Sequence, residues 1–204
     1  MRALTVVGIV IAAFSSLFYF LDAHLHSFYI FSPPALHALA LEALTLHPND
    51  TRSAVSHITQ SLALTHTPYM NPSPTEWVFN NHGGAMGAMV ILHASVTEYL
   101  IVYGSAIGTE GHTGRHTADD YFHMLQGTEL AWRAGEFEPE VYPPGSVHLM
   151  RRGEAKQYAC KEACFALEYA RGWIPPMLFF GFADSEFAIL FSSLSIICGW
   201  GWNG

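Results

Sequence analysis

A run of 19 residues without a charge near the start of the chain constrains its fold most strongly. It extends from Ala3 to Leu21, between Arg2 and Asp22. At about 1.5 Å per residue, a helix of this length spans roughly 28 Å, close to the hydrocarbon thickness of a bilayer. A cleaved signal peptide is the alternative, but the next segment stays aromatic and apolar and shows no small-residue cleavage site. We therefore predict an N-terminal membrane anchor over residues 1–22.

The charges that flank this run favour one orientation. The α-amino group and Arg2 precede it and Asp22 follows it, and positive charge is enriched on the cytoplasmic side of membrane spans. This predicts that the body of the protein is luminal. In a lumen, Asn49 of "NDT" is a glycosylation acceptor, whereas the proline in "NPS" excludes Asn71.

The composition agrees with membrane association and excludes some other classes. Half of the residues are hydrophobic, only 13% are charged and the net charge is −8. The nine lysines and arginines are scattered, so the sequence has no basic surface for nucleic acid. The cysteine count is odd, so no fully paired disulfide framework exists, although Cys160 and Cys164 are spaced to close a small disulfide.

The sequence that follows the anchor predicts an α+β fold. Segment 33–47 begins with prolines and predicts a helix, and Thr51 or Ser53 can cap a second helix that ends near Leu62. We take residues 23–75 as a helical cover. Short β-rich runs such as "EYLIVYG", "SVHLM", "KQYA" and "FALEYA" follow, with glycine and proline turns between them. Residues 76–172 therefore predict a small β-barrel that can enclose one ligand.

The last segment, residues 173–204, turns apolar again. Only Asp184 and Glu186 interrupt it after Arg171. Two carboxylates in the middle disfavour a second membrane span. We predict a C-terminal segment that lies on the membrane or covers the barrel.

Glu168 is the most unusual residue of the β-rich region, because it lies in the apolar strand "FALEYA". Burying an unpaired carboxylate costs several kcal/mol or forces it to take a proton. An ion pair with Arg171 or Lys156 is the structural explanation. The functional explanation is a second carboxylate nearby, since two such groups cannot both ionise cheaply and one then keeps its proton. That pair can donate a proton or hold a cationic amine.

The densest polar cluster is "EGHTGRHTADDYFH", residues 110–123. Two histidines and a carboxylate can bind iron or zinc, so a metal-dependent oxygenase that uses His112, His116 and Asp119 is one hypothesis. The alternative for His112 and His116 is a loop in which they bond backbone carbonyls. Asp119 and Asp120 would point to opposite faces of a strand, and the sequence leaves open which of them faces inward.

Other kinds of chemistry lack their motifs. The sequence offers no serine or cysteine nucleophile with a partner base, no phosphate-binding loop and no dinucleotide fingerprint. Acid–base catalysis that needs no cofactor is therefore the kind of chemistry that the sequence leaves open.

Several stretches of the chain resemble the fungal C-8 sterol isomerases, which are relatives of the animal sigma-1 receptor. They are residues 76–116, "ADDYF", "YPPG" and "FALEYARGWIPPMLFFGFAD", and the resemblance covers about residues 20 to 190. It implies one N-terminal membrane helix, a cupin-like barrel without a metal, membrane-associated C-terminal helices, an endoplasmic reticulum location and possible trimers.

The resemblance also implies an activity and a site. The fungal proteins move the sterol double bond from C8–C9 to C7–C8 in ergosterol synthesis, without a cofactor. Lipophilic amines and morpholine fungicides would bind as mimics of the cation. Glu168 matches the family glutamate that binds the ligand amine in the receptor, and Tyr99 matches the tyrosine that orients it. We expect Glu168 with Asp119 or Asp120 to be catalytic. The expected substrate-binding residues are Tyr99, Glu98, Trp77, Met89, Phe122 and Trp173.

Two features depart from the family pattern. Phe122 occupies the position at which the receptor carries its second carboxylate, so either Asp119 or Asp120 supplies the partner of Glu168 or the pair differs from that of the receptor. After about Ala188 the resemblance fades, because the end of the chain lacks a basic helical tail. The runner-up function is a non-catalytic binding protein for lipophilic amines and sterols.

Overall fold

The computed structural model describes residues 2–71, 74 and 76–178, so most of the predicted C-terminal segment lies outside the described residues. The chain divides into two units, residues 1–30 and the remainder, and each is described separately. The first unit contains helix α1 (Arg2–Ala23) and a 3₁₀ turn (Leu25–Ser27). Residues Leu4–Ala23 of α1 are long and apolar enough to cross a membrane.

The second unit begins with α2 (Pro33–Leu46) and α3 (Thr51–Thr65), and a 3₁₀ turn (Thr67–Tyr69) follows. The cap of α3 is Asp50, whose carboxylate accepts a hydrogen bond from the Ser53 amide at 3.0 Å. The prediction that Thr51 or Ser53 caps this helix is therefore wrong. An aspartate at this position supplies an acceptor for one of the unpaired amides of the first helical turn.

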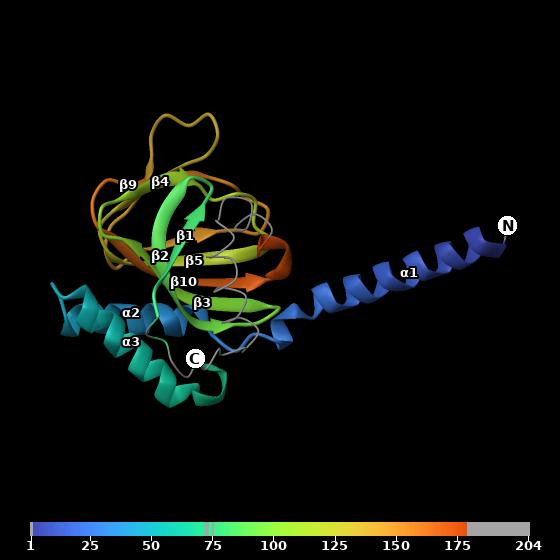
Figure 1. The fold of residues 1–204 in the computed structure, drawn as a ribbon, viewed down its shortest axis with the longest axis horizontal. Coiled ribbons are helices and arrows are strands. Elements are labelled where there is room, and N and C mark those ends of the chain that lie inside the picture. Colours follow the sequence, from blue (N-terminus) through green and yellow to red (C-terminus); the bar gives the residue numbers. More distant parts are fainter. Residues whose placement is uncertain (1, 72–73, 75, 179–204) are drawn as a thin grey trace, which may run out of the picture. The chain divides into compact units, whose positions relative to one another are not determined.

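Within the described residues, ten strands form two antiparallel sheets, and with the helices they make the predicted α+β fold (Figure 1). The six-stranded sheet has the order β1-β2-β3-β10-β5-β8, and the four-stranded sheet has the order β4-β9-β6-β7. The pairings recorded among the described residues do not close the two sheets into one barrel. The strands are β1 (Val78–His82), β2 (Ala85–Ala94), β3 (Glu98–Ser105), β4 (Thr109–His112), β5 (Ala118–Gln126), β6 (Glu129–Trp132), β7 (Glu140–Tyr142), β8 (Val147–Met150), β9 (Gln157–Cys160) and β10 (Cys164–Gly172).

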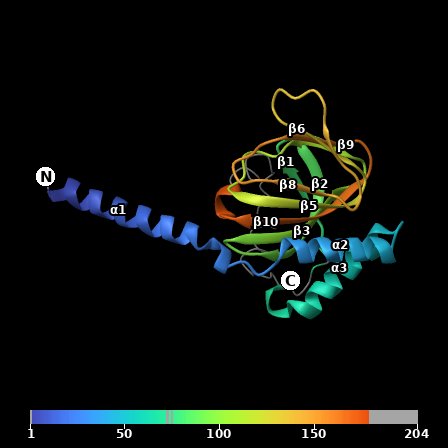
Figure 2. The same cartoon turned by 180° about the vertical axis from the view of Figure 1, so that it is seen from behind.

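Helices α2 and α3 cover one face of the six-stranded sheet, which we call the outer face (Figure 2). His37 of α2 stacks on His123 of β5 with ring centroids 5.6 Å apart. The Tyr169 hydroxyl oxygen of β10 lies 3.0 Å from the Phe31 carbonyl oxygen. Leu167 and Tyr169 on this face are fully buried. Part of the hydrophobic core of this unit therefore lies between the helices and this sheet.

The opposite, inner face of the six-stranded sheet packs against the four-stranded sheet. Met124 of β5 and Ala166 of β10 form one buried cluster with Cys160 of β9. Cys160 and Cys164 are joined by a disulfide at this end of the two sheets. We call the region between the two sheets the interior.

Candidate active site

Glu168 lies in the middle of β10, on the inner face. Its direct partners in the sheet are Ile101 of β3 and Phe122 of β5, and the three side chains share one face because directly opposed residues of antiparallel strands do so. The Tyr99 hydroxyl, two residues before Ile101, donates a very short hydrogen bond to the Glu168 carboxyl. This is the partner recorded for the Glu168 carboxyl among the described residues. Within the described part of the chain, Lys156 bonds His148 and Arg171 bonds Tyr121, and neither bonds the Glu168 carboxyl.

The interior is not completely filled around this carboxyl. Tyr99, Phe122 and Glu168 are only half-buried, although they point between two sheets. Leu167 and Tyr169, which alternate with Glu168 on the outer face, are fully buried. The inner face therefore leaves free surface beside Glu168, which the outer face does not.

Asp120 is the second carboxyl on the inner face. It pairs with Ala170 of β10, one inward position from Glu168, and is 7% exposed. Its Oδ2 lies 3.3 Å from Nδ1 of buried His116. The structure thus brings Asp120 and Glu168 onto the same face with an imidazole beside Asp120.

This arrangement raises the pKa of Glu168 well above its usual value. Burial is the largest cause, because it disfavours the charged form, and the negative charge of Asp120 acts in the same direction. The hydrogen bond from Tyr99 opposes them by stabilising the carboxylate, and the more distant charge of Glu129 raises the pKa further. The same surroundings raise the pKa of Tyr99, so its hydroxyl stays a donor. Glu168 is therefore set up to hold its proton to a higher pH than an ordinary carboxyl group does.

Two of the expected site residues lie on the outer face instead. Glu98 is fully buried there and accepts a hydrogen bond from the Tyr169 hydroxyl at 2.6 Å. Asp119 accepts a hydrogen bond from the Arg152 amide at 2.9 Å. Since side chains alternate along a strand, Tyr99 and Asp120 face inward and their neighbours Glu98 and Asp119 face outward. The structure does not bring Glu98 or Asp119 together with Glu168.

The other expected substrate-binding residues divide in the same way. Met89 and Phe122 belong to the inner-face cluster around Ile101 and Tyr103. Trp77 is 44% exposed and packs edge-on against Phe165, outside this cluster. The Trp173 carbonyl accepts a hydrogen bond from the Thr117 hydroxyl.

The histidines of segment 110–123 do not assemble as metal ligands. Among the described residues, no three His, Cys, Asp or Glu side chains are placed to hold a metal ion. His112 is exposed and its Nδ1 accepts from the Gly114 amide, His116 lies at Asp120, and Asp119 faces away from both. His123 stacks on His37 on the outer face, where burial lowers its pKa to about 4.

Sequence reasoning missed a second buried polar group, made by Glu129, His148 and Lys156. His148 Nδ1 lies 3.0 Å from Glu129, and Lys156 Nζ lies 3.0 Å from His148 Nε2. The three residues come from different strands and turns, so no local spacing identifies them. One feature of the sequence could have indicated this group. Glu129 and His148 are titratable residues within short, otherwise largely apolar strands.

Fold and site together define a class of protein: helix-covered antiparallel sheets with two neighbouring carboxyl groups in their interior, one of which has a raised pKa. Comparison with known sequences makes this specific. The chain belongs to the family described as "ERG2 and Sigma1 receptor like protein", which it matches over residues 8–198. The match continues past Ala188, where the resemblance was expected to fade.

The similar curated proteins include fungal enzymes and animal receptors. The C-8 sterol isomerase ERG2 of Gibberella zeae is 60% identical over 183 residues, which are 90% of this chain and 77% of the relative. The Aspergillus fumigatus isomerase is 60% identical over 178 residues, 87% of this chain and 74% of the relative. The sigma non-opioid intracellular receptor 1 of Gallus gallus is 37% identical over 161 residues, 78% of this chain and 71% of the relative.

Solved structures with a similar fold include cupins. An RmlC-like cupin from Shewanella frigidimarina has a TM-score of 0.44 and 13% sequence identity, over 53% of this chain and 94% of that one.

Proposed function

We propose that this chain is a C-8 sterol isomerase that moves the double bond from C8–C9 to C7–C8 by acid–base catalysis. Its family and its relatives at 60% identity support the reaction. The observation that carries the mechanism is the position of Glu168 and Asp120 on one inner face, where burial and the charge of Asp120 keep a proton on Glu168.

In this mechanism the protonated Glu168 carboxyl donates its proton to C9. The electrons of the double bond form the new C9–H bond, which leaves a tertiary cation at C8. The carboxylates of Glu168 and Asp120 stabilise this cation. Asp120 then takes a proton from C7, and the electrons of that C–H bond form the C7–C8 double bond. No net proton or electron is gained, and proton exchange of both carboxyl groups with water restores the site between turnovers.

Tyr99 and His116 act as positioning residues in this proposal. The Tyr99 hydroxyl holds one oxygen of Glu168, so the carboxyl presents its proton in a fixed direction. His116 lies beside the Asp120 oxygen that receives the C7 proton. Met89 and Phe122 supply apolar surface for the sterol rings.

A cofactor-free conversion tests this function. We expect the purified full chain in detergent to convert a Δ8-sterol into its Δ7 isomer without added nicotinamide or flavin. In D₂O the product should gain one deuterium at C9, because the acid that protonates C9 exchanges with water between turnovers. Mass spectrometry of the product measures both. Failure to convert the sterol would contradict the function, and conversion without deuterium would contradict the proposed proton donor.

The second candidate function is binding of lipophilic amines without turnover. The observation that favours it is the identity with sigma receptors, together with the carboxyl pair that can hold an ammonium group. In our proposal, lipophilic amines and morpholine fungicides bind this chain as inhibitors, because their cation takes the place of the C8 cation. We also propose that the chain can form trimers.

For location, we propose an endoplasmic reticulum protein that α1 anchors in the membrane, with its body in the lumen. The length and composition of α1 support the anchor. Asn49 is exposed just before α3, where a glycan has room. We expect a glycosidase-sensitive increase in mass that the Asn49→Gln variant lacks. In sealed microsomes, a membrane-impermeant reagent added outside reaches only the cytoplasmic side. Labelling of the residues after α1 by such a reagent would contradict this orientation.

A further inference from the structure

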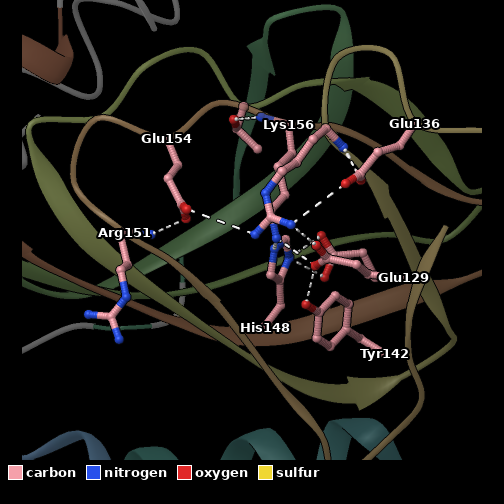
Figure 3. A network of polar contacts seen from close by, with 10 residues as sticks. Glu129, Glu136, Tyr142, His148, Arg151, Glu154 and Lys156 are labelled. Carbon is pink, nitrogen blue, oxygen red and sulfur yellow. Dashed lines mark hydrogen bonds and ion pairs between the residues drawn. The ribbon is translucent and has the colours of Figure 1, made fainter.

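A second polar group is buried in the interior, and Figure 3 shows its side chains. Glu129 on β6, His148 on β8 and Lys156 just before β9 form it, and each is 3% exposed. Lys156 also bonds Glu140 at 2.5 Å, and the Tyr142 ring stacks on His148 with centroids 4.3 Å apart. Burying these charges is costly unless they are paired or serve a ligand.

The direction of the hydrogen bonds in this group follows from its chemistry. The Lys156 ammonium has only donors, so it donates to His148 Nε2 at 3.0 Å. His148 then carries its own proton on Nδ1 and donates it to the Glu129 carboxylate, whose two oxygens lie 3.0 and 3.1 Å away. Glu129 is therefore held in place as an ionised acceptor.

The Glu129 carboxylate has more acceptor capacity than these contacts use. An ionised carboxylate offers about four lone-pair sites, and His148 Nδ1 is the donor recorded for it within the described part of the chain. A buried carboxylate with so few donors is costly unless another donor arrives. It is suited to a ligand hydroxyl.

Glu129 faces the same interior as Glu168. It pairs directly with Cys160 of β9, and Cys160 packs with Met124 and Ala166 of the inner face, next to Glu168. From the other side, His148 pairs with Phe122, and Phe122 pairs with Glu168. Two steps between neighbouring strands separate His148 from Glu168 at the backbone, about 10 Å. The charge of Glu129 also contributes to the raised pKa of Glu168.

The far end of the same face is apolar. Ala170 lies beyond Glu168 along β10, and it packs with Ala118, Ile174 and Met177. From the Cys160 end to this end, the interior thus offers the Glu129 carboxylate of the four-stranded sheet, then the carboxyl pair of the inner face, then apolar side chains.

We propose that Glu129, held by His148 and Lys156, accepts a hydrogen bond from the C3 hydroxyl of the sterol and so sets which carbons meet Glu168. The inference rests on the proposed function and adds the subsite that orients the substrate. A sterol carries its hydroxyl at one end, the C8–C9 bond two fused rings away and its alkyl chain at the other end. This order matches the order of groups along the interior.

The test compares cholest-8-enol with cholest-8-ene, which lacks the C3 hydroxyl. We expect wild-type kcat/KM to be about 10- to 100-fold higher for the alcohol, mainly through KM, because the contact is made equally in the ground and transition states. In Glu129→Gln this preference should fall several-fold, since a neutral acceptor binds a hydroxyl more weakly than a carboxylate. A purely structural defect would lower kcat/KM equally for both substrates and would leave their ratio unchanged.

Glu136→Gln is the matched control. Glu136 is 41% exposed and contacts Arg133 at the rim of the same polar network, so its variant should keep the wild-type ratio. A wild-type ratio near one, or an unchanged ratio in a Glu129→Gln protein with wild-type thermal stability, would overturn the proposal. If Glu129→Gln does not fold, Glu129→Asp takes its place, because it keeps the charge but withdraws the carboxylate by one methylene, and the same fall in the ratio is expected. Failure of wild type to isomerise either compound would instead reject the isomerase function.

Discussion

Replacing Glu168 with glutamine is expected to lower kcat for sterol isomerisation by about 10²- to 10⁴-fold, the usual contribution of a general acid. Glutamine keeps the size of the side chain and still accepts the hydrogen bond from Tyr99, but it cannot protonate C9. The wild-type rate should fall as the pH rises through the raised pKa of Glu168, because only the protonated carboxyl is the acid. Initial rates over a pH series measure both effects.

Glu162→Gln is the control for this variant, because Glu162 is exposed in the turn between β9 and β10. It should isomerise the sterol at the wild-type rate. A folded Glu168→Gln protein with a rate within a few fold of wild type would show that the proton comes from another group.

The second large effect is expected at Asp120. Asp120→Asn should lower kcat by about 10²-fold or more, because it removes the base that takes the C7 proton. It also removes the negative charge that raises the pKa of Glu168, so the loss of activity at high pH should begin at a lower pH than in wild type. A pH–rate profile separates the two consequences.

The neighbouring Asp119 provides a control of identical chemistry. Asp119→Asn changes a side chain of the outer face that bonds the Arg152 amide, and its kcat and pH profile should stay close to those of wild type. Equal losses in the two variants, or a larger loss in Asp119→Asn, would contradict the assignment of the base to Asp120.

The choice between these two aspartates shows where sequence reasoning ends. Strand alternation establishes that one of them faces inward, but the register of β5 against β10 decides which one. Asp120 pairs with Ala170 and shares the face of Glu168, and this pairing joins residues about 50 positions apart. The same alternation separates Tyr99 from Glu98, which were both expected at the substrate.

Local patterns predicted much of the fold. The charge-free run, the prolines at Pro33 and Pro34 and the β-rich runs gave α1, α2, β3 and β10, because periodicity and turn residues act over a few positions. The division into two sheets depends on long-range pairing, which these patterns do not contain. The cap of α3 depends on whether a side chain one residue earlier reaches the first turn, so it was assigned one or more residues too late.

The buried Glu129–His148–Lys156 group was hidden for a similar reason. Each residue alone resembles an ordinary polar position near a turn, and Lys156 was considered only as a partner for Glu168. Strand pairing places Glu129 on the inner side of one sheet and His148 on the inner side of the other. The three side chains come together only through this long-range pairing of strands.

The most direct test of the acid–base account is the sterol profile of yeast that lacks its own C-8 isomerase and expresses either this chain or its Glu168→Gln variant. Expression and membrane content of both proteins are measured in parallel. We predict that the wild-type chain clears Δ8-sterols and that the variant, at equal abundance, leaves them in place. Persistent Δ8-sterols with an abundant, amine-binding wild-type chain, or equal clearance by the variant, would contradict catalysis by Glu168.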